Sequence, residues 1–103
     1  MAGLSRNSDP SSPKYAFFTN HAHVLFLIAQ ESDARMRELA TEVGITERAV
    51  QRIVEDLTTT GYLLVTKEGR RNHYQIQCAK PLRHPVEAHR SLGDLIRFIY
   101  PEL

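Results

Sequence analysis

The stretch EVGITERAVQRIVEDL, residues 42–57, carries the pattern that predicts the fold. Its spacing is that of a helix with two unlike faces, at 100° per residue. The apolar face is formed by Ala49, Val50, Ile53, Val54 and Leu57. The opposite face holds Arg48, Gln51, Arg52 and Glu55. We therefore expect a helix over residues 46–60, capped by Thr46 and ended by Gly61, that packs one face on a core and presents the other outward.

A shorter helix is expected directly before this one, over residues 37–43. Gly44 stands where helices often end in a left-handed residue, and Ile45 is expected as a buried anchor in the turn. The small side chain of Ala40, four positions before Gly44, lets the two helices cross closely. Two helices joined by a three-residue turn form a helix-turn-helix arrangement.

The hydrophobic period changes after Gly61. Residues 62–67 are apolar and β-branched, residues 68–72 read as a turn, and residues 73–78 alternate. The alternation places Tyr74, Ile76 and Cys78 on one face, so the pattern predicts a hairpin packed on one side. We expect Cys78 to be a buried, inert thiol, because reactive cysteines need exposure and a basic neighbour.

The flanking segments complete the predicted domain organisation. Residues 1–13 are rich in Ser, Asn and Pro and are predicted to be a flexible tail. Residues 14–79 form the main domain, beginning with a buried helix from the N-cap Asn20 to about residue 32. Residues 80–103 comprise a proline-pinned linker and a last helix over residues 86–100, in which Gly93 would allow close approach of another helix.

Helix, turn, helix and hairpin together resemble the winged helix-turn-helix transcriptional regulators of the MarR and ArsR types. The resemblance covers residues 20–78 and rests on the runs ELA, VGIT, GY and GRR in this order. It implies a mainly α fold with a small β-hairpin (α+β): a three-helix core, a two-stranded wing and an additional C-terminal helix. It also implies a DNA-binding repressor or activator, usually a homodimer on a two-fold symmetric operator. Arg37 departs from the pattern, because Ser or Thr often caps this helix in the family.

The outer face of the 46–60 helix fits the chemistry of base recognition. Arg pairs with guanine, Gln with adenine, and Glu accepts from cytosine in the major groove. The first residues of a recognition helix make most of these contacts. The predicted contacts on this helix are Thr46, Glu47, Arg48, Gln51 and Arg52.

The predicted hairpin supplies local positive charge, although the chain as a whole carries only +1. Lys67, Arg70 and Arg71 stand against Glu68, which leaves +2 in this segment. A hairpin tip can follow a phosphate strand or insert an arginine into the minor groove. The predicted contacts of the wing and its flank are Arg37, Arg70, Arg71, Asn72 and His73.

The C-terminal helix has two interpretations. It either closes the core of its own chain or pairs with the first helix and the KYAFF segment of a second copy; we favour the second, because a two-fold operator demands a dimer. The predicted dimerisation residues are Tyr15, Phe17, Phe18, Leu92, Leu95, Ile96 and Ile99. An alternative function is a winged helix that binds another protein and no DNA.

Other functional classes find little support in the sequence. One cysteine among 103 residues, no signal peptide and short apolar runs favour a cytoplasmic protein without a membrane span. The five histidines lack metal-ligand spacing, so neither a metal nor another cofactor is expected. No nucleophile elbow or phosphate-binding loop is present, which argues against an enzyme. A small-molecule effector between core and dimer helices remains an open alternative.

Overall fold

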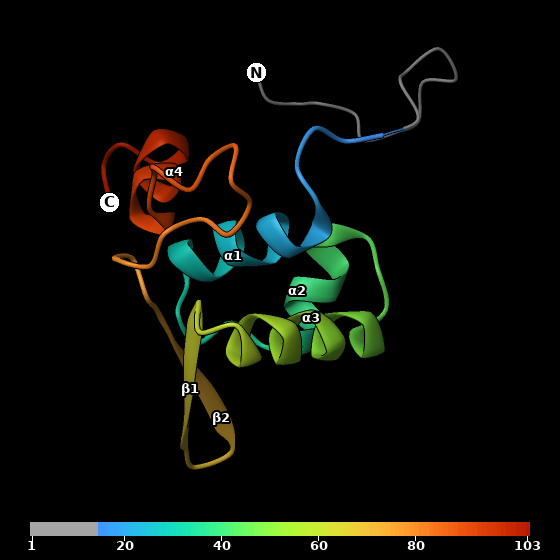
Figure 1. The fold of residues 1–103 in the computed structure, drawn as a ribbon. Helices are drawn as coiled ribbons and strands as arrows, with labels where there is room; N and C mark the ends of the chain where they lie inside the picture. Colours follow the sequence, from blue (N-terminus) through green and yellow to red (C-terminus); the bar gives the residue numbers. More distant parts are fainter. Residues whose placement is uncertain (1–14) are drawn as a thin grey trace.

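A computed structural model describes residues 15–103 of the chain. In this described range the elements are α1 (Asn20–Gln30), α2 (Met36–Val43), α3 (Glu47–Thr59), β1 (Leu63–Glu68), β2 (Arg71–Ile76) and α4 (Leu92–Ile99). Three helices, a hairpin and a further C-terminal helix confirm the predicted architecture (Figure 1). The tail predicted over residues 1–13, like Lys14, lies outside the described residues.

Helix α1 forms the centre of the molecule. Its apolar run is buried almost all round, with Val24 at 0% and Ile28 at 1% exposure. It contacts α2, α3, α4 and β2, and Figure 1 shows α4 and α3 on opposite sides of it. The cap of α1 is Thr19 and not the predicted Asn20, because the Thr19 hydroxyl accepts a hydrogen bond from the Ala22 N–H at 3.2 Å. The helix therefore begins one residue earlier than predicted.

The helix-turn-helix is fixed by local hydrogen bonds at its turn. Gly44 ends α2 in the left-handed conformation, at φ 86°, and its N–H donates to the Ala40 carbonyl at 2.8 Å. The Thr46 hydroxyl caps α3 by accepting from the Ala49 N–H at 3.0 Å. At the start of α2, the Glu38 carboxylate accepts from the N–H of the cap residue Arg35 at 3.0 Å, which is the half of a capping box that needs no Ser or Thr.

The hairpin is shifted relative to its prediction. Glu68 pairs with Arg71, so only Gly69 and Arg70 remain in the turn, where Gly69 has φ 66°. Strand β2 ends at Ile76, and Cys78 lies beyond it with an exposed side chain. The prediction of a buried Cys78 was therefore wrong, because the strand alternation was extended two residues past its end.

The C-terminal helix is shorter than the 86–100 helix predicted. Residues 85–89 form turns, and α4 begins after Ser91, whose hydroxyl accepts from the Asp94 N–H at 3.1 Å while the Asp94 carboxylate accepts from the Ser91 N–H at 3.0 Å. Gly93 does not admit another helix. A Cβ at this position would lie 2.9 Å from the Cys78 Cβ, so the glycine permits the contact of α4 with the chain segment after β2.

Candidate nucleic-acid interface

Helix α3 presents one continuous polar face to solvent. Its apolar side anchors it, with Val50 at 0% exposure and Ile53, Val54 and Leu57 also buried. Ala49, expected in this apolar arc, is half-buried. The side chains predicted to meet bases, Arg48, Gln51 and Arg52, are all exposed, as is Glu55. Burial on one face therefore fixes the direction of the polar face without using any of its side chains.

The first turn of α3 is also exposed but is partly engaged within the chain. The Thr46 hydroxyl holds the Ala49 N–H, which leaves it fewer ways to contact a ligand. The Glu47 carboxylate lies 4.0 Å from the Arg37 guanidinium of α2. Arg37 is 84% exposed, and an exposed pair at this distance is weak, so both side chains can exchange partners at low cost.

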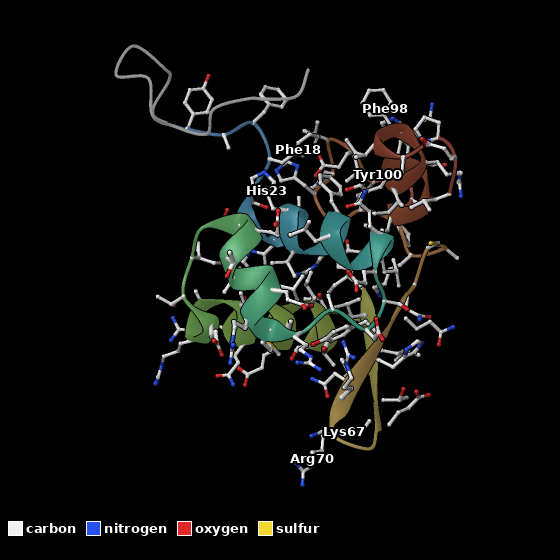
Figure 2. All side chains as sticks on the ribbon, turned by 180° about the vertical axis from the view of Figure 1, so that it is seen from behind. Phe18, His23, Lys67, Arg70, Phe98 and Tyr100 are labelled. Carbon is white, nitrogen blue, oxygen red and sulfur yellow. The ribbon has the colours of Figure 1, made fainter. Side chains whose placement is uncertain are left out.

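The wing tip carries free positive charge. Lys67 and Arg70 are exposed at the end of the hairpin, far from the C-terminal helix (Figure 2). In Figure 1 the hairpin projects from the same side of the molecule that bears α3. The described structure thus brings the outer face of α3 and the basic tip to one side, as the interpretation of the sequence requires.

Three predicted wing residues lie on β2, and the side chains of two of them have hydrogen-bond partners within the chain. Arg71 donates from Nη2 to the Asp33 carbonyl at 3.1 Å. The Asn72 amide donates to the Tyr74 hydroxyl at 3.3 Å. His73 is half-buried. Sequence reasoning missed Asp33, and its distance of 38 positions from Arg71 leaves no local pattern that would reveal the contact.

Among the acidic residues of the opening stretch, Glu55 shares the exposed face of α3 with the arginines, whereas Asp56 and Glu42 have other surroundings. Asp56, expected near Arg52 or Gln51, instead accepts a hydrogen bond from His21 of α1, with 2.8 Å between Oδ2 and Nε2. Glu42 is exposed on α2. The outward groups of α3 are therefore Arg48, Gln51 and Arg52, together with Glu55.

The predicted dimerisation residues divide into two groups. Leu92 and Ile96 are buried in the core of their own chain at 2% and 6% exposure, which corrects the favoured interpretation for these two side chains: α4 packs in cis on α1. Phe18 packs edge-to-face on Phe26, with ring centroids 5.4 Å apart. Leu95 and Ile99 are half-buried.

Large aromatic side chains remain exposed at the end opposite the wing. Tyr15 is 75% and Phe17 90% exposed, and sequence reasoning missed Phe98, which is 76% exposed on α4. Figure 2 shows Phe98, Tyr100 and Phe18 at one end of the molecule and Lys67 and Arg70 at the other. Phe98 lies off the apolar stripe of α4, and an isolated off-stripe aromatic is a weak signal in sequence.

Neither a metal-binding cluster nor a membrane-spanning helix is found among the described residues, 15–103. In this range no group of three or more His, Cys, Asp or Glu side chains is arranged to hold a metal ion. Within the same residues no helix combines the length and apolar character needed to cross a membrane.

Comparisons with known proteins agree with this geometry. A family model described as winged helix-turn-helix DNA-binding matches residues 19–63, which span α1 to the start of β1. Of the solved structures, 11 chains match. One is the zinc-dependent MarR family transcriptional regulator AdcR in its Zn(II)-bound state, at 26% identity and a TM-score of 0.50, covering 64% of this chain and 47% of that one. This chain thus matches about half the length of that regulator. No curated protein matches. The described structure therefore has a winged helix-turn-helix fold, with residues 19–63 similar to a winged helix-turn-helix DNA-binding family and the fold similar to that of a MarR family regulator.

Proposed function

We propose that the protein is a sequence-specific transcriptional regulator that binds double-stranded DNA as a homodimer. The observation that carries the proposal is the shared direction of two surfaces. Helix α3 and the hairpin lie on one side of the described structure (Figure 1). Gln51 of α3 and Arg70 at the tip of the wing are both exposed. The major groove admits an α-helix, and a basic hairpin beside that helix can follow the phosphate backbone.

Base recognition falls to the middle of α3 in this proposal. Arg48 and Arg52 are suited to guanine and Gln51 to adenine, because each can form two hydrogen bonds with one base edge. Glu47, in the first turn, can accept from cytosine once it leaves Arg37. Attraction comes from the charges around this centre. Arg37 of α2 and Arg70 of the wing are both exposed and can pair with phosphates beside the groove.

The exposed aromatic side chains at the other end of the molecule support the proposed homodimer. Tyr15, Phe17 and Phe98 expose large aromatic surfaces there, and a second copy would bury them. Such a dimer places two α3 helices on one duplex, with half-sites about 34–36 Å apart or a multiple of this spacing. Leu92 and Ile96 hold α4, which carries Phe98, on the core of its own chain.

The decisive experiment is selection of bound sequences from a random duplex pool, using the full-length chain. We expect a two-fold symmetric consensus and binding whose affinity falls steeply as salt rises. Arg90→Ala is the control for loss of charge outside the proposed interface, since it removes an exposed arginine next to α4. This variant should bind the selected sequence as the wild type does. No duplex binding in dilute buffer would reject the proposal and would favour a winged helix that contacts another protein.

A further inference from the structure

The wing is attached to the segment between α1 and α2 by two neighbouring hydrogen bonds. The Tyr74 N–H donates to the Ser32 carbonyl at 2.8 Å, and the Arg71 guanidinium donates to the Asp33 carbonyl at 3.1 Å. The Asp33 carboxylate adds a nearby negative charge, 4.0 Å from Arg71 Nη2. These contacts join β2 to residues that precede the helix-turn-helix, 38 positions away in sequence for Arg71 and Asp33.

Packing does little to hold this part of the wing in place. A cleft of about 360 Å³ lies between residues 33–36 and residues 70–74. Tyr74 is buried at the base of the hairpin, whereas Lys67 and Arg70 near the tip are exposed. A two-stranded hairpin is marginally stable alone, so its direction depends on the contacts at its base. Arg71 provides the contact nearest the tip on the side of the cleft.

The environment of Arg71 differs from that of its neighbour Arg70. Arg70 occupies the turn and is exposed. The Arg71 side chain is 42% exposed and already has a carbonyl and a carboxylate beside it. A phosphate would have to displace both groups to take this guanidinium, while Arg70 offers its charge without such a cost.

We propose that Arg71 is a positioning residue of the wing and does not itself contact phosphate. By holding β2 on the Asp33 carbonyl, it sets where Lys67 and Arg70 meet the DNA. This inference rests on the proposed DNA-binding function. It reassigns Arg71 from the contacts that the sequence indicated and gives Asp33 a role.

The test compares Arg70→Ala with Arg71→Ala in the full-length protein. Affinity for a selected duplex is measured over a range of salt concentrations. Loss of a phosphate contact lowers the slope of log affinity against log salt by about 0.9 per bound subunit. We expect this change in Arg70→Ala. In Arg71→Ala we expect affinity to fall about tenfold, the effect of one charge-assisted hydrogen bond, with the slope unchanged.

A second readout needs no DNA. Hydrogen exchange of the Tyr74 amide reports the neighbouring attachment to Ser32. We expect this exchange to accelerate about tenfold in Arg71→Ala and to stay unchanged in Arg70→Ala. Arg71→Met, which keeps the aliphatic stem, takes the place of the alanine variant if that variant does not fold.

The outcomes separate this inference from the proposed function. A salt slope that flattens equally in both variants would overturn the positioning role and return Arg71 to the phosphate contacts. Unchanged Tyr74 exchange in Arg71→Ala would also overturn it. If the wild-type protein binds no duplex, the proposed DNA-binding function is rejected. The exchange of the Tyr74 amide still shows in that case whether Arg71 holds the wing.

Discussion

Gln51 is the side chain with the most specific predicted role at the scale of single residues. It is exposed on the polar face of α3, to which Arg48 and Arg52 also belong. Gln51→Ala should weaken discrimination at one base pair by about 1–3 kcal/mol while leaving binding to random duplex unchanged. Competition between the selected sequence and its single-base variants measures this effect. Equal loss on selected and random DNA would show that Gln51 reads no base.

Gly93 gives a residue-scale prediction about stability. A Cβ there would lie 2.9 Å from the Cys78 Cβ and 3.1 Å from the Cys78 carbonyl oxygen. Gly93→Ala should therefore destabilise the fold by about 1–3 kcal/mol in urea unfolding. In the double variant with Cys78→Gly the closest contact disappears. The double variant should therefore lose less stability than the sum of the losses in the two single variants. Simple additivity would contradict the steric explanation.

Individual side chains were predictable where a local period governs them. Arg48, Gln51 and Arg52 were identified as outward-facing because burial of Val50 and Ile53 fixes the rotation of α3. Arg71 was placed in the turn, since nothing nearby in the sequence indicates its contact with Asp33. Helical periodicity is a local property, whereas a hydrogen bond across the tertiary structure depends on the whole fold.

At the scale of elements, the start of α4 shows how capping decides a boundary. The sequence predicts a helix from residue 86, directly after the proline-pinned linker, but Ser91 and Asp94 cap it at Leu92. Similarly, Gly69 closes a two-residue turn that draws Arg71 and Asn72 into β2. The existence and order of the elements followed from hydrophobic periods. Their ends depend on caps and on positive-φ residues, for which a sequence offers several candidates.

The cap of α4 yields a prediction that depends on pH. The hydrogen bond from the Ser91 backbone N–H is the main cause that lowers the pKa of Asp94 below its ordinary value, and the bond from Arg97 acts in the same direction. A carboxyl with a lowered folded-state pKa stabilises the fold at neutral pH, and this contribution is lost as pH falls below about 4. The stability difference between wild type and Asp94→Asn should therefore shrink in acid.

Thermal unfolding of both proteins between pH 7 and about pH 3 measures this difference. Ser91→Ala provides a related control, because it removes the hydroxyl of the cap but keeps the carboxylate and the backbone N–H. It should cost about 0.5–2 kcal/mol at neutral pH. A difference between wild type and Asp94→Asn that stays constant with pH would assign the effect to packing and not to charge.

At the scale of the whole molecule, the exposed aromatic end predicts the oligomeric state. Phe98 is 76% exposed, so Phe98→Glu should leave the fold intact but produce monomers in sedimentation, with weaker binding to the two-fold site. Leu64→Glu, the same change at a half-exposed apolar side chain of β1, should sediment as wild type does. A Phe98→Glu protein that remains dimeric would exclude this face as the interface.

The central position of α1 couples the aromatic end of the protein to helix α3. The same helix contacts α4 on one side and α3 on the other, and His21 near its start bonds to Asp56 of α3 (Figure 1). An association that shifts α1 at the aromatic end therefore changes the free energy of groove binding. By thermodynamic linkage this coupling is reciprocal, so operator DNA would tighten subunit association by the same factor.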